Sequence, residues 1–201
     1  MELVLATRNR DKARELAALL SGLEIRVRTL DEFPQAPDVV EDGSTCEANA
    51  VKKATEIARA TGCLAVADDT GLEVDALGGQ PGPYAARYAG PGATYEDNCR
   101  KLLGELEGVS WERRTARFVT VAALATPWGE VKTTQGVLEG VIADQCRGEH
   151  GFGYDPVFYV PAVGKTLAEL APEKKNQISH RAKAFLKLRD LLKELSEEQH
   201  I

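Results

Sequence analysis

Two kinds of periodicity follow one another along the chain, and their order limits the folds open to it. In the first third, short apolar segments at 2–6 and 63–67 alternate with segments of helical period. Later, residues 115–126 and 130–143 form two β-rich runs around a Pro-Trp-Gly sequence at 127–129, a composition typical of a hairpin. Strands that alternate with helices and then give way to a hairpin predict an α/β fold with a mixed central sheet.

Apolar positions that recur every three or four residues predict three helices. One follows the first strand, one covers residues 45–60, and the last begins near Ser179. A fourth helix is predicted from Thr94, where Asp97 three positions later suits a capping box. The core-facing positions of the first three helices are Ala13, Leu16, Ala17 and Leu20; Ala50, Ala54, Ile57 and Ala58; and Phe185, Leu188, Leu192 and Leu195.

Length and composition limit the domain organisation and the kind of partner. A chain of 201 residues with 43% hydrophobic residues suits a single domain, 1–201, or two small lobes that share a cleft. The formal net charge of −6 argues against a surface for nucleic-acid polymers, but it suits a divalent cation. No apolar run approaches the roughly 20 residues of a membrane span, and no signal-peptide pattern opens the chain. We expect a cytoplasmic protein without membrane partners.

The four cysteines are far apart in the sequence, and none belongs to a C-x-x-C pair. This spacing predicts neither a zinc site nor a redox motif, and reduced thiols in or near a core are expected instead. The four are Cys46, Cys63, Cys99 and Cys146.

The first candidate site lies between the first strand and the helix that follows it. There the sequence reads Thr7-x-Asn9-x-x-Lys12. A tight strand-to-helix turn presents free backbone N–H groups at the positive end of a helix, which suits phosphate, and the side chains add further donors. The segment is not a Walker loop. The alternative is an N-capped surface helix with solvated charges.

The second candidate is Asp68-Asp69, which we expect at the end of the apolar strand 63–67. Ligands in open α/β sheets bind beyond the carboxyl ends of strands. Successive strand residues point to opposite sides, so the two carboxylates are expected to have different roles, one of them binding Mg²⁺ or orienting a water. Glu41, in a loop rich in proline and acidic residues, is a candidate second metal ligand. The alternative is that both aspartates cap a turn before Gly71.

A third candidate is the pair Asn49 and Lys53, which are four residues apart and therefore share one face of the predicted helix 45–60. The fourth combines the segment 152–155 (Phe-Gly-Tyr-Asp) with Lys175 and the sequence Ser-His-Arg at 179–181. Aromatic rings separated by glycine offer a flat surface for a nucleotide base, and Asp, His and Arg offer directional hydrogen bonds to its edge. The alternatives are a glycine-containing turn and an N-capped helix.

Taken together and in this order, the motifs resemble those of the inosine triphosphate pyrophosphatase family, the Ham1-like pyrophosphatases of non-standard purine nucleoside triphosphates. The resemblance covers nearly the whole chain. The matching motifs are Leu5-Ala6-Thr7-x-Asn9-x-x-Lys12, Asn49-Ala50-x-x-Lys53-Ala54, Ala67-Asp68-Asp69-Thr70-Gly71-Leu72-x-Val74-Asp75, Pro81-Gly82-x-Tyr84-x-Ala86-Arg87-Tyr88, Gly151-Phe152-Gly153-Tyr154-Asp155-Pro156-x-Phe158 and Ile178-Ser179-His180-Arg181.

This resemblance implies a homodimeric enzyme with an elongated central mixed sheet flanked by helices and an active-site cleft between two lobes. Such enzymes use Mg²⁺ to split purine nucleoside triphosphates (ITP, dITP and XTP) into monophosphate and pyrophosphate, which removes non-standard nucleotides from the pool. Glu41 and Asp69 would bind the metal, with Asp69 as the general base. His180 and Arg181 would read the base. The other implied substrate contacts are Thr7, Arg8, Asn9, Arg10, Asp11, Lys12, Lys53, Thr70, Phe152, Gly153, Tyr154, Asp155 and Lys175.

One position departs from the family pattern. Family members usually carry Glu where this chain has Ala48, and Glu47 stands one position earlier on a different helical face. Two other functions therefore stay open. One is a pyrophosphatase of pyrimidine or other modified nucleotides, and the other is a nucleotide-binding regulatory module without turnover.

Overall fold

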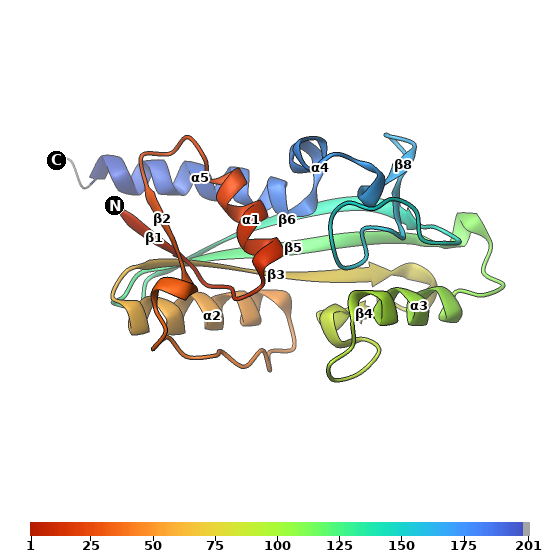
Figure 1. Cartoon of the computed structure of the whole chain (residues 1–201), viewed down its shortest axis with the longest axis horizontal. Helices are drawn as coiled ribbons and strands as arrows, with labels where there is room; N and C mark the ends of the chain where they lie inside the picture. The colour runs from red at the N-terminus through yellow and green to blue at the C-terminus, as the bar shows by residue number, and fades with distance from the viewer. Residues whose placement is uncertain (199–201) are drawn as a thin grey trace. The chain divides into compact units, whose positions relative to one another are not determined.

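The computed structural model describes residues 1–198 and has the predicted α/β fold with a mixed sheet (Figure 1). The helices are α1 Arg10–Leu19, α2 Cys46–Thr61, α3 Tyr95–Glu105, α4 Pro172–Ile178 and α5 His180–Glu198. The strands are β1 Glu2–Leu5, β2 Arg26–Thr29, β3 Leu64–Val74, β4 Pro81–Gly82, β5 Thr115–Ala125, β6 Val131–Ile142, β7 Phe158–Val160 and β8 Lys165–Thr166. In the described residues no helix is both long and apolar enough to cross a membrane.

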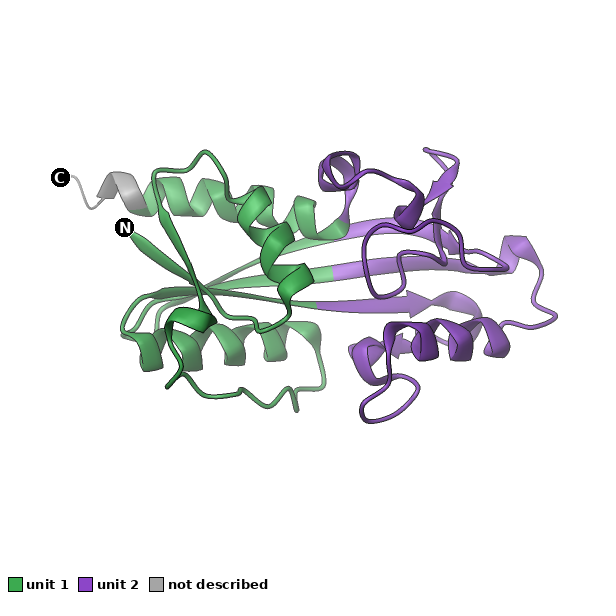
Figure 2. Ribbon diagram, in the orientation of Figure 1, with its two compact units in different colours: residues 1–69, 120–136, 180–201 green, residues 70–119, 137–179 purple. Residues whose placement is uncertain are grey.

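The strand order is β2-β1-β3-β5-β6-β7-β8, and β4 pairs with β3 away from this path. Strand β1 is parallel to both β2 and β3, whereas β4 pairs antiparallel with β3, and β7 with both β6 and β8. The chain separates into two compact units, shown in green and purple in Figure 2. Unit 1 comprises residues 1–69, 120–136 and the described part of 180–201, and unit 2 comprises residues 70–119 and 137–179. The predicted cleft stays a prediction.

The core of unit 1 follows the period-2 alternation of its strands. Val4, Ala65 and Ala67 pack in one cluster with α2. Leu3, Leu5 and Val66 belong to a second cluster, with α1 and α5. Figure 1 shows α2 on one face of these strands and α1 and α5 on the other. Residues next to each other on β1 or β3 therefore contact different helices.

The predicted apolar faces of α2 and α5 are confirmed, with Leu195 only partly buried in the second. The face predicted for α1 is wrong at Ala17, which is exposed, while Leu19 is buried. On a helix of 3.6 residues per turn, Leu16, Leu19 and Leu20 define one face, and Ala17 lies about 100° away from Leu16.

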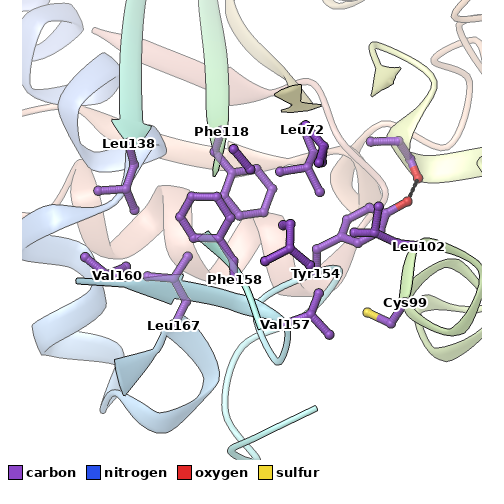
Figure 3. Packing of buried hydrophobic residues seen from close by; sticks show 14 of the residues in the cluster. Leu72, Cys99, Leu102, Phe118, Leu138, Tyr154, Val157, Phe158, Val160 and Leu167 are labelled. Atoms are coloured by element: carbon purple, nitrogen blue, oxygen red, sulfur yellow. Dashed lines mark hydrogen bonds between the residues drawn. The ribbon is translucent and has the colours of Figure 1, made fainter. Parts of the chain in front are cut away.

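Unit 2 has one apolar core, built around two aromatic rings. The ring centroids of Phe118 and Phe158 are 4.4 Å apart. Figure 3 shows Leu138 and Leu167 on one side of these rings and Tyr154 on the other. The Tyr154 hydroxyl donates to the backbone oxygen of Ala85 at 2.8 Å.

Two predictions about the strands have opposite outcomes. The hairpin is confirmed, because β5 and β6 flank a turn in which the backbone N–H of Thr126 donates to the oxygen of Glu130. The expected end of a strand at Asp68-Asp69 is wrong, because β3 continues to Val74. Its second half is retained as a strand by antiparallel pairing with β4, where Leu72 lies opposite Gly82.

Candidate functional site

The end of strand β1 determines where the two aspartates are placed. Its parallel pairing with β3 ends where Leu5 lies opposite Val66. One further bond follows, in which the Ala6 N–H donates to the Val66 oxygen. Strand β3 runs on, so Asp68 and Asp69 lie just past the carboxyl end of β1, the position where open α/β sheets bind ligands.

The turn after β1 is organised by its own side chains. The Thr7 hydroxyl oxygen accepts from the N–H of Asn9 at 3.1 Å. The Asn9 side-chain oxygen accepts from the N–H groups of Asp11 at 3.0 Å and Lys12 at 3.1 Å, and so caps α1. The helix is N-capped, as the alternative interpretation of this segment holds, and the cap at Asn9 brings Lys12 into the first turn of α1, close to β3.

Asp68 faces α1 and α5 and is surrounded by positive charge. Its Oδ2 atom accepts from Nε of Arg181 at 3.1 Å and lies 3.5 Å from Nζ of Lys12. The Nη1 atom of Arg181 donates to Oε2 of Glu15 at 2.7 Å. Burial acts to raise the pKa of Asp68, but Lys12, Arg181 and Lys53 outweigh it and hold the pKa well below its usual range. Asp68 therefore stays ionised.

The same network shifts the pKa values of its basic members in opposite directions. Burial lowers the pKa of Lys12, and the nearby charges of Lys53 and Arg181 add to that effect. Burial also acts to lower the pKa of Arg181, but the carboxylates of Asp68 and Glu15 reverse it and raise the pKa. Arg181 is consequently a permanent charge in the interior of unit 1.

Asp69 faces the other way, toward α2. Its Oδ2 atom accepts from the Asn49 amide at 3.1 Å, and the Asn49 oxygen accepts from the Gly43 N–H at 2.8 Å. Nζ of Lys53 lies 3.7 Å from Oδ1 of Asp69 and donates to Oε1 of Glu41 at 2.7 Å. Burial raises the pKa of Asp69, although Lys53 and Lys12 oppose the rise. A raised pKa makes this carboxylate a stronger base than a solvated aspartate.

The two predictions for this region are confirmed. Asp68 and Asp69 have different environments because successive strand residues point to opposite sides. Asn49 and Lys53 share a face of α2, and both contact Asp69. The buried ammonium of Lys53 acquires a raised pKa, because Asp68, Asp69 and Glu41 outweigh the lowering effect of burial.

The carboxylates of Glu41 and Asp69 both lie against the Lys53 ammonium and so close to each other. Among residues 1–198, no three or more His, Cys, Asp or Glu side chains are grouped to hold a metal ion. Mg²⁺ commonly binds through one or two carboxylates and takes its other oxygens from water and substrate phosphates. The Glu41 and Asp69 donor set fits that mode of binding.

Ala48, which stands where family members usually carry Glu, lies at the start of α2. Glu47 is exposed and accepts from the Thr133 hydroxyl at 3.2 Å, so it does not supply the carboxylate that Ala48 lacks. The half-buried Cys46 lies beside Asp69, and burial together with this carboxylate raises the pKa of its thiol to about 12.

A second group of predicted residues lies in unit 2. Oδ2 of Asp155 accepts from the Phe152 N–H at 2.9 Å and from Nζ of Lys175 at 2.6 Å. The Lys175 ammonium lies 4.9 Å from the centroid of the Phe152 ring. The centroids of the Phe152 ring and the exposed Tyr95 ring are 5.9 Å apart. Gly151 has φ +74°, and a Cβ there would stand 2.1 Å from Asp155 Oδ2. Phe152 of this segment and Tyr95 of α3 together form an aromatic surface, whereas Tyr154 belongs to the core.

Other predicted residues are placed as follows. Arg8 pairs with Asp38 and donates to the Ala36 oxygen, while Arg10 and Asp11 lie in the first turn of α1. Thr70 directly follows Asp69 in β3. The buried His180 begins α5, where β6 comes very close: a Cβ on Gly136 would stand 2.1 Å from the His180 backbone oxygen. Only glycine permits this approach.

Unit 1 thus gathers Lys12, Glu41, Lys53, Asp69 and Arg181, and unit 2 gathers Phe152, Asp155 and Lys175. Glu15 was not predicted to belong to the site. Its position three residues after Lys12 places both side chains on one face of α1, and this spacing could have indicated it. The functional roles predicted for individual residues stay predictions.

A capped helix, lysines and paired carboxylates beyond the end of a parallel strand are typical of proteins that bind phosphate groups. The Ham1 family model matches residues 3–191, and the chain belongs to this family.

Relatives and solved structures agree with this assignment. The chain is 53% identical over 194 residues to a dITP/XTP pyrophosphatase of Geobacillus kaustophilus, covering 96% of this chain and 95% of the relative. A dITP/XTP pyrophosphatase of Desulforamulus reducens is 52% identical and is matched over 100% of both chains. The structure of a HAM1 protein from Coxiella burnetii superposes with a TM-score of 0.87 at 44% identity, covering 96% of this chain and 99% of that one.

Proposed function

We propose that the chain is a nucleoside triphosphate pyrophosphohydrolase that converts dITP, ITP and XTP into the monophosphate and pyrophosphate. This activity removes non-standard purine nucleotides from the nucleotide pool. The relatives named dITP/XTP pyrophosphatase match it at about half identity over nearly their full length. The observation that carries the proposal is the convergence of Asp69, Glu41, Lys53 and Lys12 beyond the end of β1.

The phosphates bind at the start of α1 and beside Lys53. The N-terminus of α1 offers a positive dipole to the triphosphate, and Thr7 and Lys12 belong to the same turn. Lys53 and Lys12 neutralise charge on the leaving pyrophosphate. Asp68, which Arg181 holds, keeps Lys12 in place on the α1 side of β3.

Hydrolysis between the α- and β-phosphates needs a water aligned opposite the leaving pyrophosphate. Asp69 accepts a proton from that water as general base, and its burial-raised pKa favours this role. Asn49 fixes one oxygen of Asp69, which leaves Oδ1 on the side of Lys53 and Glu41. Glu41 and Asp69 would hold Mg²⁺, which would supply positive charge to neutralise the phosphate oxygens.

The base is distinguished by its C6 substituent. Phe152 offers a stacking face beside the Lys175–Asp155 pair. Hypoxanthine and xanthine carry an acceptor oxygen at C6, to which His180, Arg181 or a backbone N–H donates. An adenine amine would leave such a donor buried and unpaired, so we expect ITP to be preferred over ATP by at least ~10²-fold in kcat/KM.

We also propose that the 201 residues form one two-lobed domain that works as a homodimer in the cytoplasm, with no nucleic-acid polymer or membrane as partner. The near-complete coverage of Ham1 proteins in both directions supports a single domain. Molecular mass from light scattering tests the dimer.

A nucleotide panel with product analysis tests the activity. The expected result is monophosphate plus pyrophosphate from ITP, dITP and XTP with Mg²⁺, little product from ATP, and none with EDTA. Preferential turnover of pyrimidine triphosphates would replace the purine assignment. Nucleotide binding without any product would identify a regulatory module instead.

A further inference from the structure

Two of the four cysteines, far apart in the sequence, meet beside the segment that is proposed to bind the base. Cys99, on α3, is 2% exposed, whereas Cys146, in the loop after β6, is exposed. Nothing in the mechanism above uses either thiol. They are called the thiol pair below.

Both members of the thiol pair border residues 153–156. The Cys99 thiol donates to the Gly153 oxygen at 3.4 Å. The loop that carries Cys146 runs beside the same segment, because the N–H of the next residue, Arg147, donates to the Pro156 oxygen at 2.9 Å. The Cys146 thiol also lies close enough to the Cys99 thiol to raise its pKa. A small oxidant can reach the exposed thiol first, and the buried thiol beside it can then complete a disulfide.

We propose that Cys99 and Cys146 are a modification site that forms a reversible disulfide and thereby weakens binding of the nucleotide base by the adjoining segment 151–155. The oxidant is a low-molecular-weight disulfide, such as oxidised glutathione. The effect on binding rests on the proposed function. Formation of the disulfide does not depend on it.

The reaction proceeds by two exchanges. The Cys146 thiolate attacks one sulfur of the small disulfide, a mixed disulfide forms, and one small thiolate leaves. The Cys99 sulfur, after losing its proton to solvent, attacks Cys146 and displaces the second small thiolate. Both small thiolates take up protons, so two protein thiols are oxidised and one small disulfide is reduced to two thiols.

The order of attack follows from burial. Exposed Cys146 can be reached by the small disulfide, whereas Cys99 is enclosed in the core of unit 2 between α3 and the 153–157 segment (Figure 3). Burial raises the pKa of the Cys99 thiol to about 12, and the neighbouring Cys146 and Asp155 add to the rise. Cys99 therefore reacts second, once the mixed disulfide is held against it.

Oxidation alters the base-binding segment in two ways. The Cys99 sulfur loses its hydrogen and can no longer donate to the Gly153 oxygen. The two sulfurs also move to a bond length of about 2 Å, which draws the Cys146 loop toward α3. Gly153 lies between Phe152 and Tyr154, so its displacement shifts the Phe152 ring. We expect KM to rise roughly 2- to 10-fold, which equals the loss of about one hydrogen bond's worth of contact with the nucleotide.

The test uses the full-length protein incubated with oxidised glutathione. Peptide mapping by mass spectrometry is expected to show a Cys99–Cys146 cross-link that a thiol reductant removes. In the Cys99→Ser variant, glutathione should remain attached at Cys146. The KM for ITP should rise on oxidation and return on reduction. Cys146→Ser should keep the basal activity and lose the response, and Cys63→Ser, the matched control in unit 1, should keep both.

Failure to find the Cys99–Cys146 cross-link would overturn the proposal. A response of KM that persists in Cys146→Ser would overturn it too, and would direct attention to Cys46 beside Asp69. A cross-link with unchanged KM overturns the effect on binding. If the reduced protein has no activity on ITP, the proposed function fails, while peptide mapping still decides whether the disulfide forms.

Discussion

Each unit contains a buried arginine, and the two have different kinds of partner. In unit 2, Arg114 is 8% exposed and donates to three backbone oxygens, those of Leu106, Val109 and Ala143, at 2.7, 3.0 and 2.9 Å. In unit 1, Arg181 is 3% exposed and donates to two carboxylates, of Asp68 and Glu15.

The different partners give the two arginines different roles: Arg114 holds backbone segments together, and Arg181 positions other charged side chains. Backbone oxygens satisfy the donors of Arg114 without being ionised, so this arginine joins the end of α3 to the residue after β6. The partners of Arg181 are ionised, and one of them, Asp68, also lies 3.5 Å from Lys12. A change at Arg181 is therefore transmitted to other charges of the candidate site, whereas a change at Arg114 alters only how segments of unit 2 are held together.

The largest expected effect is that of Arg181→Met. It removes the buried guanidinium from the carboxylates of Asp68 and Glu15, which costs about 3–5 kcal/mol of unfolding free energy. The displaced Lys12 should also reduce turnover of the molecules that remain folded. Urea unfolding and kcat/KM for ITP measure the two effects. A stable variant with normal turnover would remove Arg181 from the charge network.

Asp69→Asn should lower kcat by ~10²-fold or more, because the amide cannot accept the proton of the attacking water. The fold should be retained, since the amide is uncharged and of similar shape. Circular dichroism serves as the control for folding. Turnover close to that of the unchanged protein would assign the general base to another residue.

Arg114→Met sharpens the comparison from the other side. Three buried backbone oxygens lose a charged donor, so we expect a loss of about 2 kcal/mol in unfolding free energy. At temperatures where the variant is folded, kcat for ITP should be unchanged. A reduced kcat in fully folded protein would show that unit 2 transmits this change to the chemistry.

The smallest expected effect is that of Glu47→Ala. Glu47 is exposed and bonds to Thr133, so its removal should change stability by no more than about 0.5 kcal/mol and turnover by less than about 2-fold. A larger loss in steady-state turnover would mean that Glu47 takes over the role of the carboxylate missing at Ala48.

Local patterns predicted the parts of this fold that depend on local contacts. The stripe of α2, the cap at Thr94 and the β5–β6 turn each follow from residues within a few positions of one another. The opposite orientation of Asp68 and Asp69 follows from the period of a strand. Family resemblance rather than periodicity pointed to Glu41 and Asp69 together.

Features that depend on distant partners were not predicted. The sequence Asp-Asp-Thr-Gly is typical of a turn, yet β3 continues because Leu72 pairs with Gly82 of β4. The helix α4 and strand β8 are too short to show a period. The Arg181–Glu15 bond joins α5 to α1, and the thiol pair joins α3 to the loop after β6. The partners in each contact are far apart in the sequence, so local patterns could not predict that they pair.

The alternation along β3 makes the site depend on the register of the strand as well as on the identity of its residues. One extra residue inserted just before Asp68 would move Asp68 to the place of Asp69, facing Asn49 and Lys53, and would move Asp69 to the place of Thr70 on the opposite face. Both carboxylates would still be present, but the inserted residue would occupy the position beside Lys12 and Arg181. Insertions and deletions of one residue in this stretch are therefore expected to abolish activity even where every side chain survives, whereas changes of two residues would preserve the facing.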